Sequence, residues 1–295
     1  MLPQPFCALE RESDLRINGL TNQHWTRQQD FLSTLLDQPR CGLISDFDGT
    51  LSAYVGDPAT AVIAPENGVL LDVLSQKLTV VALISGREVR NLRLRFEHPA
   101  LIYYGSHGME YWQDDQVHVI GDARQWAEPL QHLLAEFGDP AIAGVFVEPK
   151  TVTASVHYRL AENPTETRDV LYARLLPLCK KYGFVLSTGQ FIWEIKPPVA
   201  IDKGSAAQSV IEAYRLESVI FLGDDVTDFA AMDRLATLAA DPKRSLMALS
   251  IGVVHPTSSA ELFEHCNLTA NGIEDVTHLL RWMTEYLNSA RSAPR

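Results

Sequence analysis

Short apolar runs of strand length alternate with helical segments along two stretches of this 295-residue chain, and this alternation restricts the possible folds most strongly. The first stretch contains apolar runs at 41–47 and 78–84, followed by helical patterns at 66–77 and 88–96 respectively. Strands that alternate with helices form a parallel sheet with helices on both faces. The sequence therefore predicts an α/β fold with a doubly wound, Rossmann-like parallel sheet as its core.

A different pattern interrupts this alternation after Tyr104. The interruption begins with a hairpin pattern at 108–120, centred on Asp114 and Asp115. It continues with a helical pattern at 124–137, alternating apolar and polar residues at 145–158, a helical pattern at 165–181 and renewed alternation at 184–195. Such alternation is typical of antiparallel strands. We therefore expect residues 121–198 to form an inserted α+β cap domain.

The first alternation returns after Pro198, with helical patterns at 203–214, through Met232 and at 274–287, and apolar runs at 219–222 and 246–251. A core domain of residues 41–120 and 199–295 is therefore predicted to be split by the cap. Residues 1–40 are expected to form a helical lead-in. A helix is predicted at 24–36, where one face carries Trp25, Phe31, Leu32 and Leu35.

The composition restricts where such a protein would work and what it would bind. The longest apolar runs have strand length, far below the roughly 18 residues of a membrane span, so no membrane crossing is expected. Residues 1–9 lack the features of a secretory signal, and four cysteines without CxxC spacing argue against a zinc site or a disulfide framework, which favours a reducing cytoplasm. A formal net charge of −12 disfavours binding to nucleic acid or to acidic membranes. A phosphate site would therefore need local positive charge.

Two aspartates, Asp46 and Asp48, lie at the end of the first apolar run in the sequence DFDGT. Ligands bind at the carboxyl edge of strands in open α/β sheets. A carboxylate beside a divalent cation can attack phosphorus, and a second acid two positions later can protonate the leaving oxygen and then activate water. The alternative is a strand-ending turn in which Asp48 binds only the backbone. A calcium loop is excluded because its glycine belongs at the sixth place, which is Leu51.

Two further segments could bind phosphate. Ser85 and Gly86 end the next apolar run just before a predicted helix, where a hydroxyl and free helix amides can form a phosphate cradle. An ordinary N-cap serine is the alternative. Lys203 opens the helix after Pro198, where its ammonium could hold both a phosphate and Asp46, although a lone surface lysine is the commoner explanation.

Three acids, Asp224, Asp225 and Asp228, follow the apolar run at 219–222. Clustered acids at a sheet edge repel one another unless a cation lies among them, and hard oxygen ligands beside phosphate select Mg²⁺. A solvated acidic turn is the alternative.

All four segments fall at expected strand ends or at a helix start. In this order, DxDGT, SGR, DKG and GDDxTD resemble the four motifs of the phosphatases of the haloacid dehalogenase superfamily. From about Cys41 to near the C-terminus, the chain more narrowly resembles the trehalose 6-phosphate phosphatases. The additional matches are GSHGME at 105–110, VEPKTVTASVHYR at 147–159 and WEIKP at 193–197.

The resemblance implies several contacts with a sugar phosphate, the expected small-molecule partner. The residues implied are Gly86, Arg87, His107, Glu148, Lys150, His157, Arg159 and Glu194. Alternation along 151–159 places Thr153, Ser155, His157 and Arg159 on one face and Val152, Ala154, Val156 and Tyr158 on the other. A mixed-charge face solvated by water, or a structural role for His107, is the alternative. One departure is Phe229, at a place where the family commonly has an acid.

We hypothesise that Mg²⁺ is held by the Asp46 carboxylate, the backbone carbonyl of Asp48, Asp224 and waters, while Asp225 and Asp228 orient these ligands. Asp46 would attack phosphorus, and Asp48 would act as general acid and then general base. The expected reaction is hydrolysis of trehalose 6-phosphate through an aspartyl phosphate. Alternatives are a phosphatase acting on sucrose phosphate or a glucosyl conjugate, a phosphomutase, or a binding module without chemistry.

Overall fold

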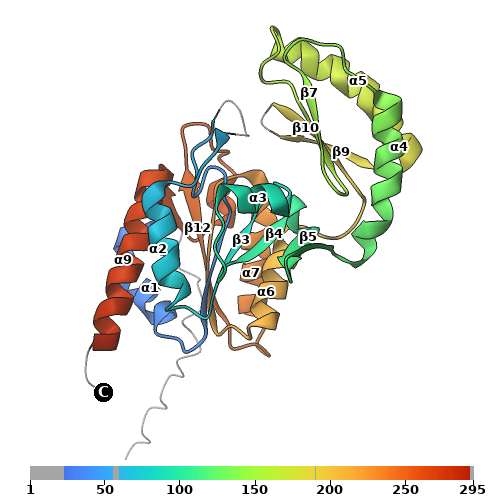
Figure 1. Cartoon of the computed structure of the whole chain (residues 1–295). Coiled ribbons are helices and arrows are strands. Elements are labelled where there is room, and N and C mark those ends of the chain that lie inside the picture. The colour runs from blue at the N-terminus through green and yellow to red at the C-terminus, as the bar shows by residue number, and fades with distance from the viewer. Residues whose placement is uncertain (1–22, 56–59, 190, 293–295) are drawn as a thin grey trace, which may run out of the picture.

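A nine-stranded sheet forms the centre of the larger part of the protein (Figure 1). The structure, a computed structural model, describes residues 23–55, 60–189 and 191–292. In spatial order the strands are β1 (Gln23–His24), β13 (Leu268–Asn271), β12 (Met247–Val254), β11 (Ser218–Gly223), β2 (Cys41–Ser45), β3 (Val80–Ile84), β4 (Ile102–Gly105), β5 (Glu110–Gln113) and β6 (Gln116–Val119). The strands from β1 to β4 are parallel, and the hairpin β5–β6 extends the sheet in antiparallel fashion.

Helices cover both faces of this sheet, as Figure 1 shows. One face carries α1 (Gln29–Leu36), α2 (Pro65–Ser75), α3 (Val89–Arg95) and α9 (Gly272–Ser292). The other carries α6 (Lys203–Ala213), α7 (Phe229–Ala240) and α8 (Leu262–His265). Every residue of β2, β3 and β11 is buried, because strands covered on both faces contribute apolar side chains in both directions. Among the described helices, none combines the length and apolar character that a membrane crossing requires.

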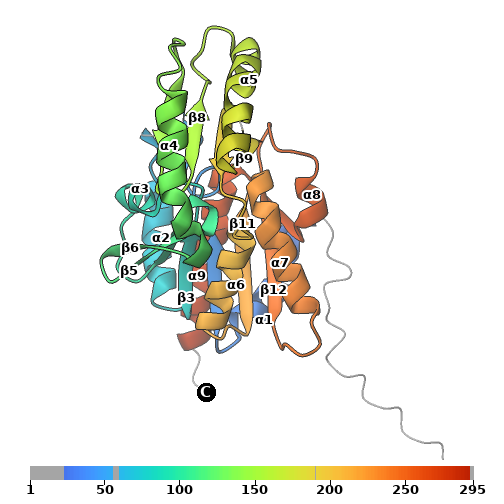
Figure 2. The same cartoon turned by 90° about the vertical axis from the view of Figure 1, so that its right-hand side faces the viewer.

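A second, four-stranded sheet lies at the carboxyl edge of the parallel strands (Figure 2). Its antiparallel order is β7 (Phe146–Pro149), β8 (Ala154–His157), β10 (Ile192–Lys196) and β9 (Val185–Gly189). Helices α4 (Ala127–Phe137) and α5 (Pro164–Tyr182) pack on one face of it, against Ala154, Val156 and Trp193. We call these six elements the four-stranded unit. Its other face is directed towards the core.

The turn between β4 and β5 touches the segment through which the chain returns from the four-stranded unit to the core. Ser106, His107 and Gly108 all have positive φ, at 49°, 58° and 98°. A Cβ on Gly108 would lie 2.6 Å from the carbonyl oxygen of Asp202, so only glycine fits there. Asp202 caps α6 by accepting from the Ser205 amide, which places Lys203 in the first turn of α6. The turn between β4 and β5 and the returning segment therefore meet directly beside Lys203.

The structure corrects two expectations about the secondary structure. The helix predicted at 24–36 is divided, because a 3₁₀ turn over Trp25–Arg27 precedes α1 and Gln28 lies between them. Asp275 of α9 accepts hydrogen bonds from the side chains of His24 and Trp25, and these long-range contacts fix that turn. Strand β8 is shorter than the predicted 151–159 alternation. The part of the predicted lead-in over residues 1–22 lies outside the described residues.

Candidate active site

The four sequence motifs meet at the carboxyl edge of the central strands. Asp46 follows β2, Ser85 follows β3 and Asp224 follows β11, while Lys203 is the first residue of α6. These parallel strands are neighbours, in the order β11, β2, β3, so the residues that follow them converge.

Lys203 connects two buried carboxylates. Its Nζ lies 2.9 Å from Asp46 Oδ1 and 2.7 Å from Asp228 Oδ1. Burial acts to lower the pKa of Lys203, but Asp228 and Asp46 outweigh that effect and hold the pKa above its usual value. The ammonium therefore stays charged and draws the two acids together.

Asp228 is fully engaged by the protein. Besides the bond to Lys203, its Oδ2 accepts from the backbone amides of Asp224 and Asp225, at 3.0 and 3.1 Å. A Cβ on Gly223 would lie 2.6 Å from Asp228 Cγ, which explains the glycine of GDD. Asp228 is thus placed to orient the acidic loop.

Three of the buried acids, Asp228 among them, form a site suited to a divalent cation. Asp46, Asp224 and Asp228 each place a carboxylate oxygen within 4.8 Å of the others. Burial, followed by repulsion from Asp228, raises the pKa of Asp224 to about 8, and burial also raises the pKa of Asp46 and Asp225. These shifts record the cost of crowding buried acids, which a bound cation would offset. Hard oxygen donors of this kind fit Mg²⁺.

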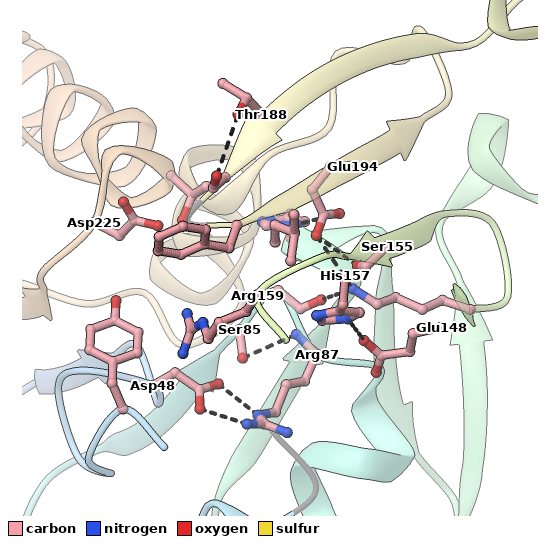
Figure 3. A pocket seen from close by; sticks show the side chains of 18 of the residues that line it. Asp48, Ser85, Arg87, Glu148, Ser155, His157, Arg159, Thr188, Glu194 and Asp225 are labelled. Carbon is pink, nitrogen blue, oxygen red and sulfur yellow. Dashed lines mark hydrogen bonds and ion pairs between the residues drawn. The ribbon is translucent and has the colours of Figure 1, made fainter. Parts of the chain in front are cut away.

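The Asp48 carboxylate points away from this cluster, towards Arg87. Arg87 donates from Nε to Asp48 Oδ2 at 2.6 Å and from a terminal nitrogen to Oδ1 at 2.7 Å, a two-pronged contact visible in Figure 3. Arg87 also donates to Asn91, one turn into α3. From the sequence, Asp48 was expected to act as general acid and base and Arg87 to contact the sugar phosphate. Their pairing was not predicted.

Ser85 and Gly86 line the space between these groups. The Ser85 hydroxyl accepts from the Arg87 amide at 3.2 Å, the contact of an ordinary turn, yet Ser85 also borders the cavity described below. A Cβ on Gly86 would lie 2.7 Å from His107 Cε1, so this glycine lets His107 approach closely.

Glu194, from β10 of the four-stranded unit, is buried against the core. Its Oε1 accepts from the Ser155 hydroxyl at 2.7 Å and lies 3.9 Å from Lys150 Nζ. Lys150 Nζ in turn donates to the carbonyl of Gly86 at 3.1 Å, which joins the unit to the core. Burial would raise the pKa of Glu194, but Lys150 and His107 hold it well below its usual range. Glu194 is therefore a carboxylate at neutral pH.

His107 Nε2 and Glu194 Oε2 face each other across the gap between core and four-stranded unit. They lie 3.8 Å apart, beyond hydrogen-bond distance, and neither atom has a hydrogen-bond partner among the described residues. Burial, with Lys196 nearby, lowers the pKa of His107 to about 4, so the ring is neutral at pH 7. Two unsatisfied buried polar atoms thus flank one small space.

The other residues implied by the resemblance also reach this region. Glu148 Oε2 and His157 Nε2 are 2.9 Å apart, and this hydrogen bond lowers the pKa of Glu148. Phe146 stacks on His157 with ring centroids 4.4 Å apart. Arg159 donates to the Val55 carbonyl and lies over the Phe191 ring.

One cavity of about 210 Å³ joins both groups of residues. The core side chains Asp48, Ser85 and Arg87 and the side chains Glu148, Ser155, His157 and Glu194 of the four-stranded unit point into the same space in Figure 3. Positive groups line it despite the negative net charge of the chain, namely Arg87, Lys150, Arg159, Lys196 and Lys203. The cavity thus combines local charge for a phosphate with polar groups that can bind hydroxyls.

Several lining residues were not singled out in the sequence as site residues. Tyr54, Phe191 and Lys196 border the cavity. Ser155, which the sequence placed only on one face of a strand, donates a hydrogen bond to Glu194. Lys196 is part of WEIKP, where alternation places it on the same face as Glu194. Phe229, which replaces an acid, stacks on His265 with centroids 4.2 Å apart.

Comparison with known proteins identifies relatives of this chain. A family model described as trehalose-phosphatase matches residues 44–263. The trehalose-phosphate phosphatase of Mycobacterium marinum is 32% identical over 225 residues, which cover 72% of this chain and 57% of that protein. The trehalose-phosphate phosphatase of Mycobacterium tuberculosis (strain ATCC 25618 / H37Rv) is 33% identical over 196 residues, with 64% and 49% covered. This chain therefore spans about half the length of these curated relatives.

A solved structure shows the same fold. The C-terminal domain of the trehalose-6-phosphate phosphatase of C. albicans superposes with a TM-score of 0.73 at 20% identity, covering 90% of this chain and 98% of that one. The predicted α/β fold with a helix-covered parallel sheet is thereby confirmed.

Proposed function

Because this chain belongs to the trehalose-phosphatase family, we infer that it hydrolyses trehalose 6-phosphate to trehalose and phosphate. The observation that carries this proposal is the shared cavity, in which Asp46 and Lys203 of the core face Lys150 and Glu194 of the four-stranded unit. Phosphate chemistry and hydroxyl recognition would thus take place on opposite sides of one space.

We propose that residues 121–198 act as the cap, which closes over the sugar and excludes water. The unsatisfied pair His107 Nε2 and Glu194 Oε2 supports this role, because a sugar hydroxyl between them could satisfy both buried atoms. Glu148, Lys150, His157 and Arg159 would provide the remaining sugar contacts.

The proposed cofactor is Mg²⁺, held by the carboxylates of Asp46 and Asp224 and the Asp48 carbonyl, with Asp225 and Asp228 orienting these ligands. When bound, the ion would neutralise negative charge on the transferring phosphoryl group.

In the first step, an Asp46 oxygen forms a bond to phosphorus while the bond from phosphorus to the sugar oxygen breaks, and Asp48 gives its proton to that oxygen. In the second, Asp48 takes a proton from water, the water oxygen attacks phosphorus, and Asp46 leaves as a carboxylate. An Asp48 that donates a proton cannot keep both bonds to Arg87. We therefore infer that Arg87 turns to the phosphoryl oxygens when substrate binds.

Phosphate release from a panel of sugar phosphates with Mg²⁺ tests reaction and substrate together. Trehalose 6-phosphate should have the highest kcat/KM; a preference for sucrose phosphate or a glucosyl conjugate would refute the substrate. An isomerised sugar phosphate without phosphate release would indicate a phosphomutase. No release at all, with or without a chelator, would favour a binding module.

The nucleophile is tested separately with Asp46→Asn, which should abolish turnover while the fold is kept, as judged by circular dichroism. Asp30→Asn, at an exposed position on α1, is the matched control and should turn over normally. Substantial activity of the Asp46 variant at saturating Mg²⁺ would contradict the assignment.

A further inference from the structure

The side chain of Tyr54 points in the opposite direction to that of an ordinary surface tyrosine. The residue is 44% exposed, and it borders the mouth of the cavity. Its hydroxyl nevertheless points inward and donates to Asp224 Oδ2 at 2.7 Å, although Asp224 itself is only 5% exposed. A partly exposed tyrosine normally turns its hydroxyl to water. The inward direction therefore indicates that the bond to Asp224 has a role.

Both oxygens of Asp224 are held in the same way by the loop that follows β2. Thr50 donates to Oδ1 at 3.1 Å, and Tyr54 donates to Oδ2. A carboxylate oxygen has two lone pairs, so each can accept one hydroxyl and still bind a cation. Two neutral donors thus fix the plane of the carboxylate without neutralising its charge.

His255, at the exit of β12, holds the adjacent turn. Its Nε2 lies 2.6 Å from the carbonyl oxygen of Gly49, the residue after Asp48, and its ring meets that of Tyr54 edge-on with centroids 5.8 Å apart. Gly49 has a φ of 82°, and a Cβ there would come within 2.2 Å of Asp224 Oδ2. The turn that carries Asp48 is therefore packed directly against Asp224.

We propose that Tyr54 and His255 are a pair of positioning residues for the cation site. Tyr54 orients the carboxylate of Asp224, and His255 holds the turn that presents the Asp48 carbonyl. This inference rests on the proposed function, because it assumes that Asp224 and Asp48 are ligands. Groups that hydrogen-bond to metal ligands typically change metal affinity by about 10–100-fold when they are removed.

The test is the affinity for Mg²⁺, measured by titration calorimetry without substrate, on Tyr54→Phe and wild type. Tyr54→Phe keeps the exposed ring and removes only the hydroxyl, so we expect Mg²⁺ to bind about 10–100-fold more weakly. Tyr286→Phe is the matched control, because Tyr286 donates to Asp37 at 2.8 Å on the far side of the core. It should bind Mg²⁺ as wild type does.

His255 is tested in the same assay by a pair of variants. His255→Ala should weaken Mg²⁺ binding, and His255→Gln, which can donate to the Gly49 carbonyl, should restore part of the loss. Thermal unfolding in a chelator shows that each variant is folded. Loss of stability with unchanged Mg²⁺ affinity would mean that the pair is merely structural and would overturn the proposal.

Tighter Mg²⁺ binding by Tyr54→Phe would also overturn it, because the hydroxyl would then be a competitor of the cation. If wild type itself bound no Mg²⁺, both the metal assignment of the proposed function and this inference would fail. Equal affinities in wild type and Tyr54→Phe would refute the inference alone.

Discussion

Replacing Glu194 by glutamine removes one negative charge from the junction of the four-stranded unit and the core while keeping the shape of the side chain. The carboxylate lies 3.9 Å from Lys150 Nζ, and the Lys150 side chain is only 5% exposed. At that distance and an effective dielectric constant of about 20, two unit charges attract each other by about 4 kcal/mol. The glutamine can keep the hydrogen bond from Ser155 but leaves the ammonium buried without its counterion.

Removing one partner of a buried ion pair typically costs about 3–5 kcal/mol. Because the ammonium of Lys150 keeps its bond to the Gly86 carbonyl, we expect the lower end of this range, about 3 kcal/mol. In a protein of this size, that loss lowers Tm by roughly 6–12 °C. Substrate binding should weaken as well, since a hydrogen bond to a charged group contributes about 1.5–3 kcal/mol, which corresponds to a rise in KM of about 10–100-fold.

Urea unfolding at several pH values measures the stability loss. The folded protein depresses the pKa of Glu194 below the ordinary 4.5, so its stabilising contribution is complete above that pH and is lost as the pH falls towards the folded pKa. The difference between wild type and variant should therefore be constant from pH 8 to pH 6 and shrink only below about 4.5. Glu136→Gln, which breaks an exposed pair with Lys181, is the control and should change little. Equal stability of Glu194→Gln and wild type at pH 7 would refute the electrostatic account.

Three further changes test other parts of the site. Phe191→Ala removes a ring that is 43% exposed and borders the cavity. The KM for trehalose 6-phosphate should rise about ten-fold, and the KM for p-nitrophenyl phosphate should stay the same. Phe263, 38% exposed on α8, provides the control, because Phe263→Ala should change neither KM. The pKa of His107 falls from an ordinary 6.5 to about 4 on folding, so wild type should lose about 2 kcal/mol between pH 7 and pH 5, as the unfolded chain takes up the proton first. Urea midpoints of His107→Gln should lack that loss, and an equal loss would rule out His107 as its source. Gly86→Ala would force His107 to shift, and kcat/KM should fall about 10–100-fold; unchanged kinetics would show that the close approach is dispensable.

The sequence predicted the parts of the fold whose burial leaves a local pattern. Strands β2 and β11 are covered on both faces, so they read as apolar runs, and the motif acids come directly after them. Strand β13 was missed because it has only four residues, LTAN, and two of them are polar. Its place between β12 and β1 depends on pairing with residues far away in the sequence.

Site residues could be predicted where a motif contains them. Contacts between residues far apart in the sequence could not. Residues Asp46, Lys203 and Asp224 were named from their motifs, and they converge because their strands are neighbours. The bond from Tyr54 to Asp224 joins residues 170 positions apart, and no local spacing encodes it. The same is true of the pairing between Asp48 and Arg87, which fixes how the proposed general acid is held.

The place of β2 in the middle of the sheet determines when the site can form during synthesis. The Asp46 amide donates to the Leu222 carbonyl, so the proposed nucleophile is fixed only after β11 has been made. The strands of the four-stranded unit pair with partners within about fifty residues of one another, from Phe146 to Lys196. Short-range pairing is fast and long-range pairing is slow. On the ribosome the four-stranded unit can therefore fold first, and the carboxylate of Asp46 comes into place only after the part proposed to recognise sugar has been completed.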